Sequence, residues 1–483
     1  MAWIKAQRCR FQATDQEQYR SRIMKRAEFN YREGFSIAPA AAPGDFLTKA
    51  PYIDHGTDPI DKTRYFSSEY MEKEWEQMWT KIWVLAGVES DLPEVGDFVT
   101  FDLRHESFLI VRGEDNAIHA YSNVCQHRGL RLVQAEFGSV ANGFTCPFHS
   151  WSYSLDGKVA NITDKETFRP ETICHNPRLP EIGCDVLAGF IFITMNESPP
   201  PLAEFMGVFG EHLRAYEPEK RVVVRHTSVE LEANWKDGVD AFLEGYHFHA
   251  IHNQVLPVID DYHVQQDLYP GGIARLIIPQ LTPSPRLGET DSLSEGLKAV
   301  MSDSGIDPAS FTGAIGDIRH SAQLAKRARA AELGVDYSGY ADSQLTDSYV
   351  YSLFPNVIMG AHPEAISAYR FLPHKSDPGK MYFDTMTLYY PVKQTDGSYA
   401  IPNWMGVSNA EVIAAEGHRQ TERFAIGDDY SKIGLLYEQD ADMMPLVHSG
   451  MRSRYFKGAI LGEQEVRIRH FHAELDRYIN GEK

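Results

Sequence analysis

Two short loops that each pair a cysteine with a histidine constrain this chain more than any other feature of its sequence. The first reads Cys125-Gln-His127 and the second Cys146-Pro-Phe-His149, so each offers one thiolate and one imidazole from a tight turn. The residues around them, between positions 98 and 194, alternate like short strands split by Gly and Asp. The sequence therefore predicts a β-rich unit that presents two ligand-bearing loops.

Two cysteines and two histidines in this pattern are typical of a Rieske [2Fe–2S] centre, in which two imidazoles replace two thiolates on one iron. The alternative is a structural zinc site with the same four ligands. Zinc fingers take their histidines from a helix at longer spacing, which favours the iron–sulfur interpretation. The predicted cluster ligands are Cys125, His127, Cys146 and His149, and the remaining cysteines are expected to be structural.

A second group of polar residues lies between Asn234 and His252. Asp240, Glu244 and His247 recur at positions i, i+4 and i+7 and would share one face of a helix. His252 follows His247 by an offset of about 140° on an ideal helix, so both imidazoles reach one ion only if the helix ends or distorts between them. Two imidazoles and a distant carboxylate are typical of non-haem iron(II) sites. The alternative is a buried helix with hydrogen-bonded histidines.

Composition limits the partners and the location. The chain has 483 residues, a formal net charge of -20 at pH 7 and five cysteines. The negative charge argues against nucleic acid and anionic membranes as partners. No apolar run is long enough for a signal peptide or a membrane span, and the cysteines are too few for a disulfide scaffold. A cytoplasmic location is therefore expected.

Three segments are expected along the chain. Residues 1–60 are polar and broken by Pro and Gly, which indicates an N-terminal extension; residues 61–198 form the cluster domain, and residues 199–483 the second domain, since Pro199-Pro-Pro201 marks the clearest boundary. Alternating runs up to position 389 predict an antiparallel sheet, and an apolar stripe after position 467 predicts a final amphipathic helix. Residues 281–347 are either a mobile cover over the site or a surface insertion.

Together, the two groups resemble the catalytic α subunit of a Rieske non-haem iron oxygenase, in the ring-hydroxylating oxygenase family. The resemblance runs from about Tyr65 to the C-terminus and includes three motifs: Asn234-Trp-Lys, Glu244-x-Tyr-His-x4-His252 and Trp151-x-Tyr-x-x-Asp-Gly157. It implies an α+β fold, with an N-terminal β-rich Rieske domain and a C-terminal helix-grip catalytic domain. It also implies two cofactors, a [2Fe–2S] cluster and a mononuclear Fe(II).

The resemblance also assigns roles to individual residues. The iron ligands are expected to be His247, His252 and Asp440, with Asp442 as the competing carboxylate. Glu244, where most ring-hydroxylating members have Asp, is expected to bridge His247 to the cluster ligand His149 of a neighbouring chain. The residues expected to line the substrate cavity are Asp240, Ala241, Gly245 and Phe248, whereas His249 is not expected to bind iron.

The implied function is that of the terminal oxygenase in a multicomponent system. Electrons would come from NAD(P)H through a reductase or ferredoxin, and O2 would be used to hydroxylate an apolar, aromatic small molecule. A monooxygenase or demethylase acting on a quaternary amine or methyl ether is the second interpretation. A homo-oligomer, a trimer with or without a β subunit, is expected. Two other classes stay open: an electron carrier with an inert second domain, and a degenerate oxygenase that serves as a binding subunit.

Overall fold

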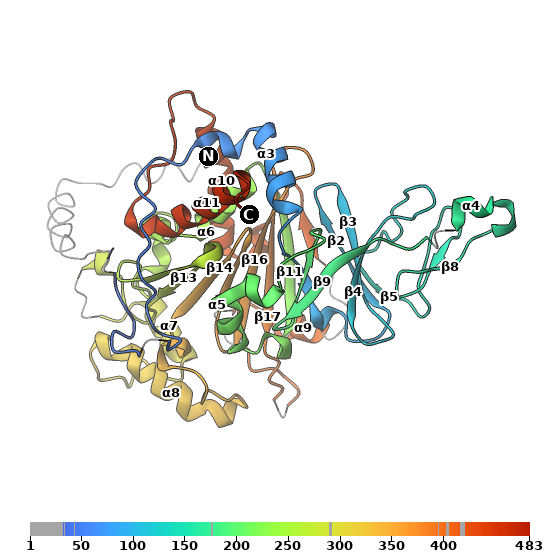
Figure 1. Ribbon diagram of the computed structural model, residues 1–483. Coiled ribbons are helices and arrows are strands. Elements are labelled where there is room, and N and C mark those ends of the chain that lie inside the picture. The colour runs from blue at the N-terminus through green and yellow to red at the C-terminus, as the bar shows by residue number, and fades with distance from the viewer. Residues whose placement is uncertain are drawn as a thin grey trace.

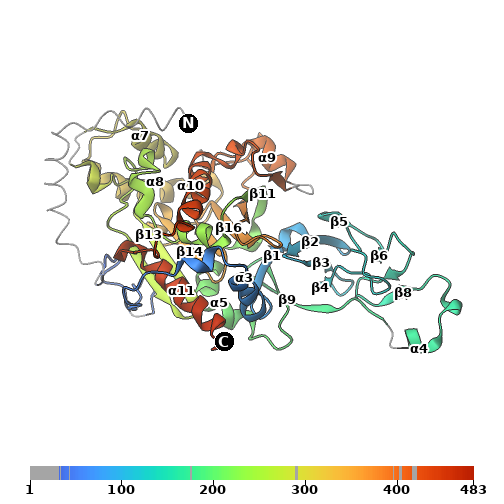
Figure 2. The same cartoon turned by 90° about the horizontal axis from the view of Figure 1, so that it is seen from above.

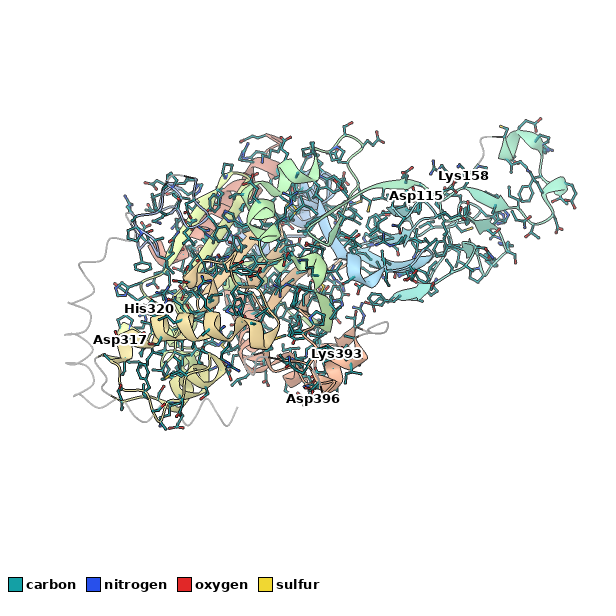
Figure 3. All side chains as sticks on the ribbon, turned by 90° about the horizontal axis from the view of Figure 1, so that it is seen from below. Asp115, Lys158, Asp317, His320, Lys393 and Asp396 are labelled. Atoms are coloured by element: carbon teal, nitrogen blue, oxygen red, sulfur yellow. The ribbon has the colours of Figure 1, made fainter. Side chains whose placement is uncertain are left out.

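The computed structural model describes residues 32, 34–42, 44–174, 177–288, 292–394, 396–401, 405–415 and 421–483. In this part of the chain a β-rich arm extends from a larger body in which helices cover an eight-stranded sheet (Figure 1). Asp115 and Lys158 lie on the arm, and Asp317 and His320 lie at the opposite end (Figure 3). The predicted α+β fold class, with an N-terminal β-rich unit before a larger sheet covered by helices, is confirmed.

The arm is built on a seven-stranded sheet in the order β1-β10-β9-β4-β3-β2-β5, in which all neighbours pair antiparallel. The strands are β1 (Val84–Val88), β2 (Asp97–Leu103), β3 (Glu106–Arg112), β4 (Ile118–Ser122), β5 (Phe137–Ser139), β9 (Glu181–Leu187) and β10 (Phe190–Thr194). A small sheet of β6 (Phe144–Thr145), β7 (Ser152–Tyr153) and β8 (Val159–Asn161) lies toward the far end of the arm, near α4 (Pro170–Ile173) (Figure 2).

The body sheet has the order β12-β13-β14-β15-β16-β17-β11-β18. Its strands are β11 (Val222–Leu231), β12 (Gln265–Tyr269), β13 (Ile273–Ile278), β14 (Ser348–Leu353), β15 (Val357–Ala361), β16 (Ala365–Pro373), β17 (Met381–Tyr389) and β18 (Glu422–Phe424). The predicted antiparallel pairing holds for all neighbours except β11 and β18, which are parallel.

Helices pack on both faces of this sheet because its strands alternate two apolar sets. On β16, Ile366 and Ala368 face one core with α5 (Leu202–Arg214), whereas Tyr369 and Phe371 face the core with the long C-terminal helices. The helices on that second face are α6 (Trp235–Phe242), α10 (Leu435–Met451) and α11 (Val466–Ile479). Each large buried side chain contributes about 1.5–3 kcal/mol to the hydrophobic stabilisation.

The root of the arm shares this core with the body. Leu103 and Ile110 of the arm lie in the same buried cluster as Phe371 and Phe383 of the body. Arg370 on β16 donates to the carbonyl oxygens of Leu85 and Ala86 at 3.2 and 3.1 Å. The predicted boundary at residues 198/199 therefore lies between units that are packed together, and its position stays a prediction.

The described part of the N-terminal extension runs along the body. Ile37 N–H donates to Gln265 Oε1 at 2.8 Å, and Ala50 N–H donates to Asp267 Oδ1 at 2.7 Å. Ile60 pairs with Ala459 in a two-residue bridge. Residues 34–60, called the N-terminal segment below, thus join the edge of the sheet at β12 to the C-terminal part of the chain. The first 31 residues of the predicted extension lie outside the described residues.

One prediction about helices needs correction, and one open alternative can be narrowed. The helix predicted to carry Glu244 and His247 ends at Phe242, so both residues belong to the turns that follow α6. The stretch 281–347, predicted as a mobile cover or a surface insertion, contains α7 (Glu295–Asp303) and α8 (Ile318–Leu333) around a small core of its own. A packed core of this kind favours the insertion. Within the described residues, no helix has the length and apolarity to cross a membrane.

Candidate cluster and metal sites

The two cysteine loops fold in the same way. In each, the cysteine N–H donates to the carbonyl five residues later, and the cysteine carbonyl accepts from the N–H four residues later (Cys125 with Leu130 and Gly129; Cys146 with Trp151 and Ser150). Gly129 and Ser150 both have positive φ, at 79° and 57°. This repeated turn explains why Cys-x-His and Cys-x-x-His can present their ligands to one place.

The loops bring the four predicted cluster residues together. Cys125 and Cys146 are buried and free. The rings of His127 and His149 lie 4.6 Å apart between centroids, and the His127 ring stacks on Trp151 at 4.9 Å. Tyr153 contacts the Cys125 Sγ at 3.3 Å and accepts from the Gln126 N–H at 2.9 Å. The site is closed on its inner side by aromatic rings.

The outer side of the cluster loops is exposed. Phe148, next to His149, has 56% of its surface accessible. The guanidinium of Arg128 lies over its ring at 5.3 Å from the centroid. An aromatic ring and a cation at the tip of the arm offer a contact surface beside the imidazoles.

The second site begins at the end of α6. Asn234 caps this helix and forms a capping box with Asp237. After Phe242, short 3-10 turns at Tyr246–His249 and Asn253–Val255 replace the α-helix. The two imidazoles can meet one ion only if the helix ends or distorts between them, and α6 ends at Phe242, before the first of them.

His247, His252 and Asp440 converge on one point. Their ligand atoms all lie within 4.8 Å of one another. Asp440 Oδ1 is 2.9 Å from His252 Nε2 and 3.6 Å from His247 Nε2. Asp440 comes from α10, more than 180 residues later in the chain, so this grouping depends on tertiary packing.

Both imidazoles are oriented through Nδ1. His247 Nδ1 lies 2.5 Å from Glu244 Oε1, and His252 Nδ1 lies 2.8 Å from Gln439 Oε1. Gln254 Nε2 donates to the same Gln439 oxygen at 2.7 Å, which identifies that atom as an acceptor. Both Nδ1 atoms therefore carry the proton in the neutral rings, and both Nε2 lone pairs face Asp440.

The negative charges of Glu244 and Asp440 change the pKa of His247. Burial lowers the pKa of this imidazole, but the hydrogen bond and charge of Glu244 and the charge of Asp440 outweigh burial and raise the pKa overall. The His247 Nε2 atom is buried and has no hydrogen-bond partner. Lone pairs of two imidazoles and one carboxylate that face each other repel unless a cation lies between them.

Buried polar contacts fix α6 against the elements that complete the site. His448 Nδ1 on α10 lies 2.8 Å from Asp237 Oδ2, which joins α10 to α6. Lys236 Nζ donates to Glu74 Oε1 at 2.5 Å, and both side chains are almost fully buried. Glu74 ends α3 (Ser68–Glu74), so three helices are tied together beside the metal site.

Other predicted residues lie apart from this point. Asp442 accepts from the Tyr430 hydroxyl at 2.7 Å, and the His249 Nδ1 lies 2.6 Å from the Tyr246 carbonyl. Asp240 accepts from the Tyr65 hydroxyl at 2.5 Å and lies 3.1 Å from His472 Nε2, in a buried network. The role of Asp240 in a substrate cavity therefore stays a prediction.

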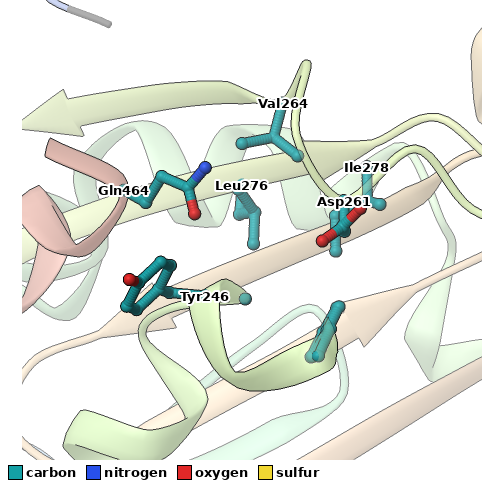
Figure 4. A pocket seen from close by; sticks show the side chains of 8 residues that line it. Tyr246, Asp261, Val264, Leu276, Ile278 and Gln464 are labelled. Carbon is teal, nitrogen blue, oxygen red and sulfur yellow. The ribbon is translucent and has the colours of Figure 1, made fainter. Parts of the chain in front are cut away.

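A small pocket lies between the turn that follows α6 and strand β13 (Figure 4). Its lining residues are Gly245, Tyr246, Phe248, Asp261, Val264, Leu276, Ile278 and Gln464. Of the residues predicted to line a substrate cavity, Gly245 and Phe248 belong to this group, and Asp240 and Ala241 do not. Because Tyr246 and Phe248 flank His247 in sequence, the pocket lies next to a predicted iron ligand.

The sequence did not predict that Gln439 orients His252, or that Asp237 pairs with His448. Gln439 directly precedes Asp440, so a search for side chains that orient an imidazole could have found it. No spacing rule connects Asp237 with His448, because the two residues meet only after α6 and α10 pack.

Sequence comparisons place the chain among known oxygenase families. The family described as "Ring hydroxylating alpha subunit (catalytic domain)" matches residues 218–481, and "Rieske [2Fe-2S] domain" matches residues 82–176. The glycine betaine monooxygenase oxygenase subunit of Pseudomonas aeruginosa (strain UCBPP-PA14) is 30% identical over 195 residues, 40% of this chain and 45% of the relative. The carnitine monooxygenase oxygenase subunit of Acinetobacter pittii (strain PHEA-2) is 33% identical over 197 residues, 40% of this chain and 52% of the relative.

These alignments span only about half the length of the curated relatives. Solved structures cover more. A quaternary ammonium Rieske monooxygenase with L-carnitine bound has a TM-score of 0.60 at 18% identity, over 88% of this chain and 97% of that chain. Naphthalene 1,2-dioxygenase from Rhodococcus sp. has the same TM-score and identity, over 88% of this chain and 95% of that chain. At such identities the structural likeness establishes the fold.

Proposed function

Because the chain belongs to the ring-hydroxylating α-subunit family and carries a Rieske [2Fe–2S] domain before its catalytic domain, we propose that it is the terminal oxygenase of a multicomponent system. The cofactors of this class are a [2Fe–2S] cluster and a mononuclear iron. The observation that carries the proposal is the convergence of two imidazoles and one carboxylate next to a pocket.

The residues at both sites fit these cofactors. Cys125 and Cys146 are buried free thiols, and His127 Nδ1 is a buried atom without a hydrogen-bond partner. At the second site, the facing lone pairs of His247, His252 and Asp440 fit a metal cation, which would relieve their mutual repulsion. We therefore assign Cys125, His127, Cys146 and His149 to the cluster, and the other three residues to the iron.

The chain's own groups prepare the iron site. When bound, the mononuclear iron supplies the place where O2 is activated, with electrons that the cluster delivers. Glu244 and Gln439 hold the Nδ1 protons and so direct both Nε2 lone pairs to the same side. Asp440 adds one negative charge. Phe248 contributes an apolar ring to the lining of the pocket.

The arrangement favours a homo-oligomer. The cluster loops lie far along the arm, whereas α6 and α10 lie in the body (Figures 1 and 2). We infer that the arm of one chain approaches the Glu244 region of a neighbour in a head-to-tail ring, such as a trimer. Glu244 Oε1 accepts from the ring Nδ1–H of His247, and Oε2 accepts from the backbone N–H of His247 at 3.1 Å. Because both carboxylate oxygens already accept one hydrogen bond, a histidine of the partner chain would bind to a remaining lone pair.

For the substrate, we propose the second interpretation of the sequence analysis, a small quaternary amine. The relatives named above act on glycine betaine and carnitine, and both compounds carry a trimethylammonium group and a carboxylate. The pocket offers two aromatic rings, Tyr246 and Phe248, and aromatic faces attract quaternary ammonium ions. An aromatic hydrocarbon remains the competing substrate class. A ferredoxin or an NAD(P)H-dependent reductase is the proposed electron donor.

Iron content and O2 uptake test the proposal together. Purified protein should be brown, show a Rieske-type EPR signal after reduction and contain about three irons per chain. About two irons per chain would support an electron carrier, and about two irons without any O2 uptake would support a degenerate binding subunit. With a surrogate reductase, glycine betaine or carnitine should stimulate O2 uptake more than naphthalene. A colourless zinc protein would contradict the assignment.

A further inference from the structure

Arg467, on the first turn of α11, is a buried cation without a hydrogen bond. Its side chain is 0% exposed, and none of its three nitrogens has a partner among the described residues. Burial lowers its pKa to about 9, although the charges of Glu244 and Asp267 oppose this effect. Charged groups are rarely buried unless an anion or a hydrogen-bond acceptor compensates them.

The nearby carboxylates already have other partners. Asp267 forms a buried ion pair with Arg275 at 2.8 Å, and Glu244 holds the ring of His247. Neither carboxylate forms a hydrogen bond with Arg467. The guanidinium therefore keeps its donors available for a group that is not part of the chain.

Arg467 is near in sequence, or through the charge of Glu244, to residues that line the pocket of Figure 4. Gln464, three residues earlier, lines that pocket, and Glu244 directly precedes the lining residue Gly245. On the neighbouring strand β12, Gln266 pairs in register with the lining residue Leu276 and donates to the Glu463 carbonyl at 3.3 Å, and its buried Oε1 has no partner among the described residues. Unpartnered donors and an unpartnered acceptor thus belong to segments that also contribute to the pocket, whereas Tyr246 and Phe248 flank the metal ligand His247 in sequence.

We propose that Arg467 binds the carboxylate of the substrate, and that the substrate is a short trimethylammonium carboxylate. A guanidinium offers a fork of N–H donors that matches a carboxylate. With the carboxylate held there, the ammonium end is directed to the aromatic rings beside His247. This inference rests on the proposed function and narrows it, because a substrate without an anionic group would leave Arg467 unpaired.

Anaerobic binding to the complete protein tests this role. The probes are glycine betaine, tetramethylammonium, which lacks the anion, and methanesulfonate and acetate, which lack the ammonium group. Arg467→Met should weaken glycine betaine binding on the order of 100-fold or more, because one partner of a buried charge pair is removed. Tetramethylammonium binding should change less than about twofold. Arg467→Lys should restore part of the affinity, because it keeps the charge without the fork.

Thermal unfolding and a matched variant separate binding from structure. Arg467→Met should raise the Tm of the ligand-free protein, since it replaces a buried unpaired cation with an apolar side chain. Arg477→Met, on the exposed side of α11 and paired with Glu474, should leave affinity unchanged. An equal loss for glycine betaine and tetramethylammonium, or a lower Tm, would overturn the proposal.

The anionic probes separate this inference from the proposed function. If the wild-type protein binds methanesulfonate or acetate but not glycine betaine, and Arg467→Met abolishes that binding, the anion site stands and the quaternary amine proposal fails. If the wild-type protein binds none of the anionic probes, the assignment of Arg467 fails even where O2 uptake establishes an oxygenase.

Discussion

At the scale of single residues, the metal site depends on side chains that do not touch the ion themselves. Glu244 and Gln439 play parallel parts, but one acceptor is charged and the other neutral. The two imidazoles therefore differ in how strongly they donate electrons, since an anionic partner makes an imidazole more basic. The neutral acceptor, Gln439, contacts His252, which is the more buried of the two rings.

Replacing Gln439 tests this orientation. Gln439→Leu should weaken Co(II) binding to the iron-depleted catalytic site about 10- to 100-fold, because His252 loses the acceptor that fixes its ring. Gln439→Glu should bind Co(II) at least as tightly as the parent. The d–d absorption of Co(II) during titration gives both affinities. Glu438→Gln, on the same helix, is the control, and unchanged affinity in Gln439→Leu would argue that the ring is held by packing.

The choice of carboxylate is a second test at this scale. Asp440→Ala should lose the mononuclear iron and product formation while the Rieske spectrum stays intact, because the cluster loops lie in the arm. Asp442→Ala and His249→Ala should keep the iron, since these side chains point to Tyr430 and to the Tyr246 carbonyl. Metal analysis of the three variants checks this prediction. Loss of iron in Asp442→Ala alone would identify Asp442, not Asp440, as the iron ligand.

At the scale of elements, the short helix α6 positions the site through its ends. Its N-terminus is capped by Asn234 and tied to α10 through Asp237, and its early end at Phe242 releases the chain into the turns that carry His247 and His252. A longer helix would have directed the two rings about 140° apart. The break is therefore a requirement of the metal site.

A half-buried histidine, His212, makes the stability of the junction between α5 and the N-terminal segment depend on pH. Burial lowers the pKa of His212 to about 3, and the ring packs against Phe46 at 4.2 Å. In the unfolded chain its pKa is about 6.5. Below pH 6.5, His212 binds a proton in the unfolded state but not in the folded state. Its contribution to the free energy of unfolding is therefore full above pH 6.5 and falls by about 1.4 kcal/mol per pH unit as the pH decreases.

His212→Phe should remove this loss. Urea unfolding at pH 7.5 and 5.5 should show a smaller decrease for the variant than for the parent, by about 1.4 kcal/mol. His320→Phe, which alters an exposed histidine on α8, should behave like the parent. If the free energy of unfolding decreased as much in His212→Phe as in the parent, another group would cause the loss of stability in acid.

Much of this organisation could be predicted where the ligands are close in sequence. The spacing of Cys125 and His127 predicts a cluster loop because local turns place both side chains, and the spacing of His247 and His252 predicts a helix break. Arg467 and Gln439 could not be assigned in this way. Their surroundings depend on how α11 and α10 pack, and no local pattern marks a guanidinium that will be buried without a partner.

At the scale of the whole molecule, the separation of the arm from the metal site makes activity a property of pairs of chains. Cys125→Ser should remove the cluster, and His247→Ala should remove the iron, so each variant alone should be inactive. In randomly mixed head-to-tail rings, an intact cluster meets an intact iron site at about a quarter of the interfaces. Product formation by the mixture should therefore recover to about a quarter of the wild-type rate.

Differently tagged chains show whether mixed rings have formed. Pull-down of one tag should recover the other variant, and the recovered sample should have the activity. Mixed rings without any activity would mean that electrons do not pass between chains.

The N-terminal segment has a consequence for the order in which the protein is made. Ile60 pairs with Ala459, and Ala50 and Ile37 bind β12. At about 5–20 residues per second, a ribosome needs roughly 20–80 s between the codons for Ile60 and Ala459. During that interval the segment has no complete binding surface, and chaperones or proteases can reach it. The N-terminal segment can therefore be protected from proteases only after the C-terminal part around Ala459 has been synthesised.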